Sequence, residues 1–357
     1  MTLIIAEAGV NHNGNEHLAY KLIDAAYKAG ADIVKFQTFK AAKLVTAHAE
    51  QADYQTKNTQ KKETQLSMLT RLELSYEFHK ELLEYCGKLG IEFLSTAFDS
   101  ESLKFLVSDL KLKRLKIPSG DLTNAPLVLE HARTGCDLIV STGMASLAEI
   151  ELALGVIAFG YIDQVTEKPS IQAFENAYYS EAGQRLLKEK VTILHCTTEY
   201  PAPLPDINLS AMDTIANAFK LSVGYSDHSA GILVPVAAVA RGAKVIEKHF
   251  TIDKNLEGPD HKASLDPIEL EAMVQGIRNI ELVLGDGLKG PRPSEVGNKL
   301  VARKSLVAEK VITKGATFSK NNLSIKRPGS GMNPIHYWQL LGKEAKKNYQ
   351  IGELIDE

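Results

Sequence analysis

The sequence predicts an α/β protein whose main part is a (β/α)₈ barrel. First, short runs rich in β-branched residues alternate with longer amphipathic segments over about 285 residues. Second, the short runs lack strict polar alternation, as expected of parallel strands that helices cover on both faces. Third, Gly9 and Gly14 flank Val10-Asn11-His12-Asn13 after the first run, and this turn lacks the GxGxxG spacing of the doubly wound alternative.

Eight candidate strands follow one another along the chain, and each has four to six residues. They are Leu3–Ala8, Asp32–Phe36, Glu92–Thr96, Arg114–Ile117, Asp137–Ser141, Val191–His195, Leu221–Gly224 and Lys244–Lys248. Helices are predicted between them. His17–Ala29 carries its apolar residues on one face, and a glycine stops it. Phe78–Leu89 shows the same pattern. Pro267–Leu284 is the last helix, with Asp266 placed as its N-cap.

Two insertions and a tail complete the organisation. Lys40–Tyr76 is long and polar, so we expect it to arch over the C-terminal ends of the strands. Thr166–Glu189 is expected to extend the helical region before the sixth strand. We assign residues 1–285 to the barrel, 286–300 to a linker and 301–357 to a small turn-rich domain.

Composition excludes several classes of protein. A net charge of -3 argues against a strongly basic nucleic-acid binder. The longest apolar run, Gly231–Ala240, is shorter than the ~20 residues of a membrane span. Residues 1–10 lack a basic region before an apolar stretch, so no signal peptide is expected. Three scattered cysteines fit reduced thiols in the cytoplasm. The tail has ten Lys or Arg and five Asp or Glu, which fits an anionic substrate or ordinary solubility charge equally well.

All eight candidate strands end in polar or charged residues, at the face where such barrels carry their active sites. Lys35 and Lys116 supply ammonium groups that suit a small ligand with phosphate and carboxylate groups. Alternatively, either lysine pairs with Glu7 or Asp121. Hydroxyl donors stand beside them in Thr96, Ser119, Ser141 and Ser226.

His228 and His249 close the seventh and eighth strands, which are neighbours in a barrel. Two neutral imidazoles side by side suit one divalent ion with open positions, and mixed nitrogen and oxygen ligation favours manganese over zinc. A structural role is the alternative. Glu7, on an otherwise apolar strand, is either ion-paired or kept for proton transfer. His195 fits core and site equally, and its neighbour Cys196 faces the other way, so no thiol nucleophile is expected.

Nine stretches, taken together, resemble the sialic acid synthases, which condense phosphoenolpyruvate with an N-acylated amino sugar. The stretches run from the first strand into the tail. They are Ile5–Gly14, Val34–Lys40, Leu115–Gly120, Leu138–Met144, His195–Pro201, Gly224–Ser229, Ile246–Thr251, Gly258–His261 and Ile325–Gly331.

The resemblance implies a barrel followed by an antifreeze-like (SAF) domain, in a homodimer whose SAF domains each cover the partner's barrel mouth. Positions that match the phosphoenolpyruvate site are Lys35, Thr96, Lys116, Ser119 and Ser226, together with Thr198, where some members have asparagine. His228 and His249 match metal ligands, with Mn²⁺ expected and Mg²⁺ or Co²⁺ as alternatives. Glu7 matches the catalytic acid/base. Positions near the sugar are Gln37, Asp121, which replaces a glutamate of many members, Tyr200, Asp260 and Arg327.

The expected function is therefore N-acetylneuraminate synthase, with N-acetylmannosamine as acceptor. Legionaminate synthesis from 2,4-diacetamido-2,4,6-trideoxymannose is the alternative, and pseudaminate synthesis is a further one. These acceptors differ by a hydroxyl and an acetamido group, so one or two contacts decide between them. A different class is a Schiff-base pyruvate aldolase with Lys35, Lys116 or Lys248 as nucleophile. A non-catalytic carbohydrate- or ice-binding protein is the last.

Overall fold

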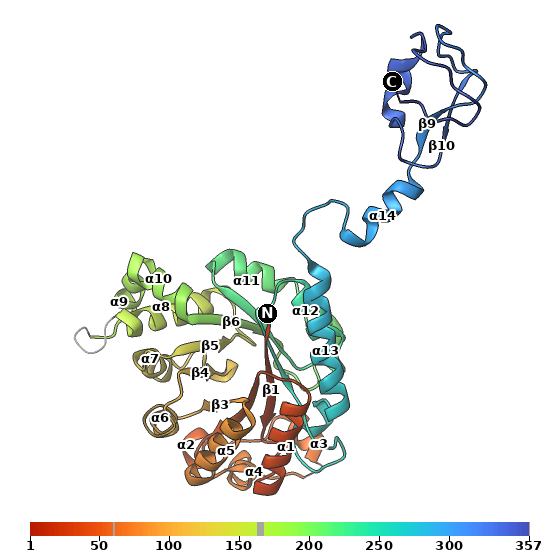
Figure 1. Cartoon of the computed structure of the whole chain (residues 1–357). Helices are drawn as coiled ribbons and strands as arrows, with labels where there is room; N and C mark the ends of the chain where they lie inside the picture. The colour runs from red at the N-terminus through yellow and green to blue at the C-terminus, as the bar shows by residue number, and fades with distance from the viewer. Residues whose placement is uncertain (60, 163–167, 357) are drawn as a thin grey trace. The chain divides into compact units, whose positions relative to one another are not determined.

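Eight parallel strands close into a barrel in the computed structural model, which describes residues 1–59, 61–162 and 168–356 (Figure 1). Each strand pairs with the next, and β8 pairs with β1. The strands are β1 (Leu3–Gly9), β2 (Ile33–Thr38), β3 (Glu92–Ala97), β4 (Arg114–Ile117), β5 (Asp137–Ser141), β6 (Val191–Cys196), β7 (Ser222–Asp227) and β8 (Val245–His249). The predicted barrel and all eight strands are confirmed.

The prediction placed the end of β7 too early. We expected the strand to stop at Gly224, whereas it continues through Tyr225 and Ser226 to Asp227. A run of polar residues does not look like a strand in sequence. In the barrel it continues the ladder, because Ser226 pairs with Glu247 and Asp227 pairs with Lys248 on β8.

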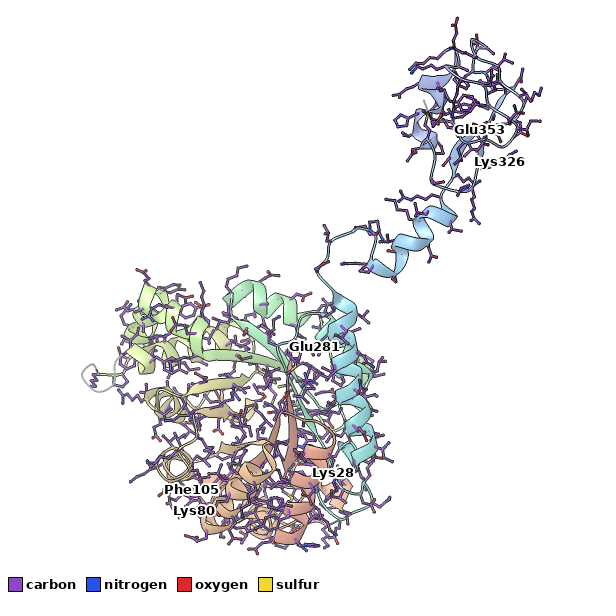
Figure 2. The ribbon with its side chains drawn as sticks, in the orientation of Figure 1. Lys28, Lys80, Phe105, Glu281, Lys326 and Glu353 are labelled. Carbon is purple, nitrogen blue, oxygen red and sulfur yellow. The ribbon has the colours of Figure 1, made fainter. Side chains whose placement is uncertain are left out.

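Helices surround the barrel in the order that the alternation predicts (Figure 1). They are α1 (Glu16–Lys28), α5 (Tyr76–Leu89), α6 (Ser100–Lys104), α7 (Ala125–Arg133), α8 (Leu147–Ile162), α11 (Ala211–Phe219), α12 (Leu233–Ala240) and α13 (Pro267–Leu284). Their ends follow local chemistry. Asp266 forms a capping box with Glu269 at the start of α13, as predicted for the cap. Figure 2 labels Glu281 on α13. Its carboxylate accepts the backbone N–H of Thr2, which ties this helix to the start of the chain.

Two layers of side chains fill the barrel, and their order follows from strand geometry. One layer is apolar, and every member is nearly fully buried: Ile5, Ile33, Leu94, Ile139, Leu194 and Val245. Alternate residues of a strand face the same side, so the residues two positions later also point inward. That second layer contains Glu7, Lys35, Thr96, Ser141, Cys196 and Glu247. The apolar layer thus forms the floor beneath a polar layer at the C-terminal ends of the strands.

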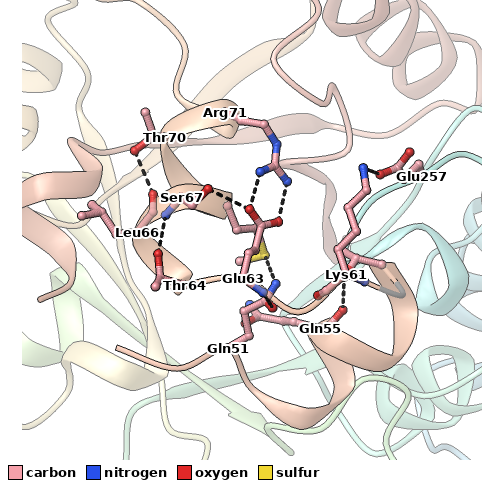
Figure 3. A network of polar contacts seen from close by, with 12 residues as sticks. Gln51, Gln55, Lys61, Glu63, Thr64, Leu66, Ser67, Thr70, Arg71 and Glu257 are labelled. Atoms are coloured by element: carbon pink, nitrogen blue, oxygen red, sulfur yellow. Dashed lines mark hydrogen bonds and ion pairs between the residues drawn. The ribbon is translucent and has the colours of Figure 1, made fainter. Parts of the chain in front are cut away.

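The insertion after β2 forms three short helices and lies against the strand ends, as predicted. These are α2 (Ala41–Leu44), α3 (Asp53–Thr59) and α4 (Gln65–Leu72). Figure 3 shows the polar contacts that hold it together: Glu63 accepts hydrogen bonds from both Arg71 Nη atoms, at 2.5 and 2.7 Å, and from Ser67 Oγ at 2.8 Å. Lys61 pairs with Glu257 in the segment after β8, which joins the insertion after β2 to the loop that follows β8.

The second insertion begins within residues that lie outside the described part of the chain. Its described part forms α9 (Ile171–Tyr179) and α10 (Glu181–Lys190), with Ser170 and Ser180 as their N-caps. Both helices pack on α8, so they extend the helical region before β6 as expected. None of the helices among the described residues is long and apolar enough to cross a membrane.

Met1–Gly285 and Asp286–Glu357 form two separate compact units. In the second unit, α14 (Pro293–Ala302) lies largely within the segment assigned to a linker, and Pro293 occupies its first turn, where proline is favoured. An antiparallel pair follows, β9 (Ser305–Ala308) and β10 (Leu323–Lys326), with a short helix, α15 (Tyr337–Leu340). This unit has a small core of its own that includes Leu306, Phe318 and Tyr349.

Candidate active site

A cavity of about 320 Å³ opens at the C-terminal ends of the strands. Twelve of the fourteen predicted site residues line it. They are Glu7, Lys35, Gln37, Thr96, Lys116, Ser119, Thr198, Tyr200, Ser226, His228, His249 and Asp260. Strand ends and the loops after them therefore bring these residues together from positions that are up to 253 residues apart in sequence, between Glu7 and Asp260.

Four buried charges lie at the bottom of the cavity, in the polar layer directly above the apolar floor. Lys35 Nζ lies 2.9 Å from Glu7 Oε2 and 3.5 Å from Glu247 Oε2. Lys116 Nζ lies 3.4 Å from Glu247 Oε1. Each of the four residues is at most 5% exposed. Two ammonium groups and two carboxylates thus form one cluster, and each charge has an opposite charge beside it.

The two carboxylates of this cluster have opposite proton affinities. Burial raises the pKa of Glu7 to about 7, although Lys35 opposes that shift. Burial also acts on Glu247, but Lys116 and Lys35 outweigh it and hold the pKa of Glu247 at about 2. Glu7 is therefore able to take up or release a proton near neutral pH, while Glu247 stays charged.

Hydroxyl groups surround the two lysines. Lys116 Nζ donates to Ser141 Oγ at 2.7 Å, and Lys35 Nζ donates to Thr96 Oγ1 at 3.1 Å. Ser226 Oγ donates to Glu247 Oε1 at 2.8 Å. These donors and ammonium groups all face one cavity, which is the inventory that a phosphate and a carboxylate require.

A glycine after β5 makes room for three more polar groups. The backbone N–H of Gly143 donates to Ser119 Oγ at 2.9 Å, and this hydroxyl lies 3.1 Å from Cys196 Sγ. A Cβ atom at Gly143 would collide with Thr198 Oγ1 and would lie 2.9 Å from Ser119 Oγ. The absence of a side chain here is what lets these hydroxyls reach the cavity wall.

His228 and His249 stand side by side, with ring centroids 5.7 Å apart. His228 Nδ1 lies 2.6 Å from the carbonyl oxygen of Thr197, which assigns the proton to Nδ1 and leaves Nε2 to accept the Tyr200 hydroxyl at 3.0 Å. Within the described chain, the buried Nδ1 of His249 has no hydrogen-bond partner.

Both imidazoles are neutral and suit a divalent cation. Burial lowers the pKa of His228 to about 4, and burial together with His228 holds the pKa of His249 well below its usual range. Unprotonated imidazole nitrogens are metal ligands, and a metal at His228 Nε2 would replace the hydrogen bond from the Tyr200 hydroxyl. The described residues contain no group of three His, Cys, Asp or Glu side chains placed to hold a metal. The pair therefore fits an ion that takes its other ligands from water and substrate, as catalytic metal sites do.

One predicted residue of the first unit does not line the cavity, and one belongs to the second unit. Asp121 lies in the turn after β4, where its Oδ1 accepts a hydrogen bond from Asn124 at 3.1 Å. Its expected place among the cavity residues near the sugar is therefore not seen. Arg327 belongs to the second unit, where its Nε donates to the carbonyl oxygen of Ala302. Lys248, considered as a Schiff-base nucleophile, also does not line the cavity and pairs with Asp227. His195 donates outward to the carbonyl of Ile207 and is not a cavity residue.

The prediction missed Glu247 and the contribution of the insertion. Glu247 is two residues after inward-facing Val245 and two before His249, so strand alternation was the signal that identifies it. The insertion adds Gln55, Gln65 and Met68 to the cavity wall. Nothing local in the sequence marks these three, because only the tertiary fold places them there.

Comparison with known proteins identifies the family. The model of the NeuB family matches residues 22–289, and the model of the SAF domain matches residues 303–357. The chain belongs to the NeuB family. This confirms the predicted resemblance and makes the protein an enzyme of the NeuB sugar acid synthase family.

Similar proteins match over nearly the whole chain. The N,N'-diacetyllegionaminic acid synthase of Campylobacter jejuni is 50% identical over 356 residues, which cover 100% of this chain and 99% of that protein. The enzyme of the same name from Legionella pneumophila is 47% identical and covers 98% of this chain and 92% of its own length. Among solved structures, the N-acetylneuraminic acid synthetase of Leptospira borgpetersenii has a TM-score of 0.66 and 32% identity, over 83% of this chain and 90% of its own.

Proposed function

We propose that the protein condenses phosphoenolpyruvate with 2,4-diacetamido-2,4,6-trideoxymannose to form N,N'-diacetyllegionaminic acid and phosphate. The observation that carries this proposal is the 50% identity, end to end, with a protein named for that product. The structural relative named for N-acetylneuraminic acid is 32% identical. The comparisons therefore favour the alternative over the N-acetylneuraminate synthase that we expected first.

The cavity wall supports this choice of sugar. The insertion contributes the apolar side chains of Val45, Met68, Leu69 and Leu72 to it. The proposed acceptor carries a methyl group in place of the C6 hydroxymethyl group and an acetamido group in place of the 4-hydroxyl, so it presents more apolar surface than N-acetylmannosamine. Contacts of this kind contribute about 0.8 kcal/mol for each buried CH₂ group.

In the proposed reaction, the chain's own charges hold phosphoenolpyruvate. The ammonium groups of Lys35 and Lys116 bind its anionic groups, and Thr96, Ser119, Ser141 and Ser226 donate hydrogen bonds to them. The C2–C3 double bond of phosphoenolpyruvate opens as carbon-3 forms a bond to the aldehyde carbon of the open-chain sugar, and the aldehyde oxygen takes up a proton to become a hydroxyl group. Water adds at carbon-2, and the C–O bond to phosphate then breaks, which releases inorganic phosphate and leaves the keto group of the product. Glu7, whose pKa of about 7 permits both protonation states, would move the proton in these steps.

His228 and His249 would hold a divalent cation, for which Mn²⁺ is our first choice. When bound, such an ion acts as a Lewis acid on the sugar carbonyl. Gln37, Tyr200 and Asp260 line the same cavity and are the residues that we assign to sugar binding. Burial raises the pKa of Asp260 to about 6. We also propose that Arg327 reaches the sugar of a partner subunit in a homodimer, as the family resemblance implies.

The decisive experiment measures phosphate release from phosphoenolpyruvate with each of the two acceptors, with Mn²⁺ and with EDTA. We expect metal-dependent release with the diacetamido sugar, at a kcat/KM at least tenfold above that with N-acetylmannosamine. The reverse preference would return the assignment to N-acetylneuraminate synthase. Absence of release with both sugars, together with a borohydride-trapped pyruvate adduct on Lys35 or Lys116, would replace the synthase by an aldolase.

A further inference from the structure

A buried ion pair lies just behind the candidate active site. Lys248 Nζ is 2.6 Å from Asp227 Oδ2, and both side chains are fully buried. Neither residue lines the cavity. The proposed reaction gives them no role, so their presence requires a separate explanation.

The position of this pair in the strands provides that explanation. Asp227 and Lys248 are directly paired residues of the parallel strands β7 and β8. Side chains alternate along a strand, so the pair faces the surrounding helices while its neighbours in sequence face the cavity. These neighbours are the cavity residues Ser226 on β7, His228 directly after β7, and Glu247 and His249 on β8.

The pair also fixes the chain on both sides of His228. Asp227 Oδ1 accepts the backbone N–H of Ser229 at 2.9 Å, and Asp227 Oδ2 accepts the Ser229 hydroxyl at 3.1 Å. Lys248 Nζ donates to the carbonyl oxygen of Ser229. The residues before and after His228 are therefore both bound to one ionic group, which leaves the intervening backbone little freedom.

Stability alone does not account for two charges at this position. Their outward-facing neighbours Tyr225 and Ile246 belong to the apolar core between barrel and helices. Transfer of an ion pair into such surroundings carries a desolvation penalty of several kcal/mol per ion, and apolar replacements of similar volume are often as stable or more stable. The best-attested use of a buried polar pair is to select one register over its alternatives.

We infer that the Asp227–Lys248 pair is a positioning clamp: it fixes the register and end geometry of β7 and β8 and thereby the separation of the His228 and His249 imidazoles. In so far as those imidazoles hold a cation, the inference rests on the proposed function. Asp227 and Lys248 are positioning residues and do not touch substrate.

The test replaces both charges at once by uncharged groups of similar shape, in the double variant Asp227→Asn/Lys248→Met. Removal of one partner alone would leave an unpaired buried charge and could unfold the protein. The matched control is Asp32→Asn/Arg278→Met. It removes an ion pair of 2.8 Å that links the residue before β2 to α13 at the opposite end of the barrel. Full-length proteins are compared by thermal melting, by Mn²⁺ binding measured through electron paramagnetic resonance, and by NMR of ¹³C-labelled histidine rings.

We expect the clamp variant to melt within about 4 °C of the wild type. It should nevertheless bind Mn²⁺ at least about 10-fold more weakly, the lower end of the effect seen when supporting residues of a metal site are lost. The ring signals of His228 and His249 should shift or split, while those of His131 and His79 stay in place. The control variant should lose stability and keep the wild-type Mn²⁺ affinity and ring signals.

Unchanged Mn²⁺ affinity in a folded clamp variant would overturn the inference. If the wild type itself binds no Mn²⁺, the proposed metal site fails, and the ring signals decide the question of the clamp. Signals of His228 and His249 that match the wild type would then overturn it, and displaced signals would support it. If the double variant does not fold, the same measurements are made on the milder single variant Ser229→Ala, which removes one hydrogen bond of the clamp. His228 ring signals that match those of the wild type in this variant would overturn the inference.

Discussion

The substitution Gly143→Ala tests the proposed phosphate end of the cavity with the addition of one methyl group. The new Cβ would collide with Thr198 Oγ1, and Ser119 Oγ and Cys196 Sγ would lie 2.9 and 3.1 Å from it. Both hydroxyls sit one bond beyond Cβ on side chains that can rotate about χ1, so the collision moves them without unfolding the barrel. Gly143 has no positive φ that alanine would strain.

The expected effect follows from the hydrogen bonds that are lost. A hydrogen bond to a charged group contributes about 1.5–3 kcal/mol. Displacement of one such donor from the phosphate therefore raises the KM for phosphoenolpyruvate about 10- to 150-fold. The KM for the sugar should change little, because Gln37 on β2 and Asp260 after β8 line the cavity from strands far from β5 in the barrel. Steady-state kinetics with each substrate varied in turn measures both values.

Gly120→Ala is the matched control for this prediction. Gly120 follows Ser119 directly, also lines the cavity, and has nothing within 4 Å of the position that its Cβ would occupy. We expect this variant to keep the wild-type KM for phosphoenolpyruvate within about twofold. A KM for Gly143→Ala that also stays within twofold, in a protein of unchanged melting temperature, would refute the placement of the phosphate beside Gly143.

Three further predictions concern other parts of the molecule. Burial lowers the pKa of His131 on α7 to about 4 from about 6.5, so the folded state resists protonation and loses stability as the pH falls from 6.5 towards 4. At pH 5 the free energy of unfolding should be about 2 kcal/mol lower than at pH 7 because of this group, and urea unfolding of His131→Leu at the two pH values should lack this difference. An equal loss of stability in the wild type and in His131→Leu would contradict the assignment of the loss to His131. Glu7→Gln keeps the shape of the side chain but removes its titrating group, and should lower kcat about 10²- to 10⁴-fold in phosphate-release assays; a fall of less than tenfold would exclude proton transfer by Glu7. An equal mixture of Glu7→Gln and Arg327→Ala proteins should regain roughly a quarter of the wild-type activity if Arg327 acts on the partner's barrel, and should stay inactive if it acts within its own chain.

Two regular patterns explain what the sequence could predict: strands that alternate with helices along the chain, and functional residues at the ends of those strands. The eight strands and their order followed from the alternation of short β-branched runs with helices. Most of the twelve cavity residues followed from their places at strand ends, because parallel strands of a barrel end at one face. The site roles of Gln37, Thr198, Tyr200 and Asp260 came only from the resemblance to the sialic acid synthases. Glu247 also lies near the end of a strand, so the same argument could have identified it, but no role was predicted for it.

Other features depend on distant parts of the chain and had no local signal. Gln55 and Met68 reach the cavity only because the insertion folds back over the strand ends. The place of Asp121 is decided by a tight turn, in which its side chain binds Asn124 and does not line the cavity. The continuation of β7 to Asp227 depends on pairing with β8, which no single segment reveals.

The sequence left two interpretations of Lys35 and Lys116: they pair with nearby carboxylates, or they bind an anionic substrate. In the structure, pairing with the carboxylates is what enables the two lysines to bind an anion. A lysine buried without an opposite charge loses its proton, and burial already lowers the pKa of Lys116. Glu247 lies 3.4 Å from Lys116 and 3.5 Å from Lys35, so its negative charge favours the ammonium form of both. An ammonium group that has kept its proton is able to bind phosphate, whereas a neutral amine is not. The carboxylates at the bottom of the cavity therefore keep the lysines charged in the free protein, ready for the anion that the proposed reaction requires.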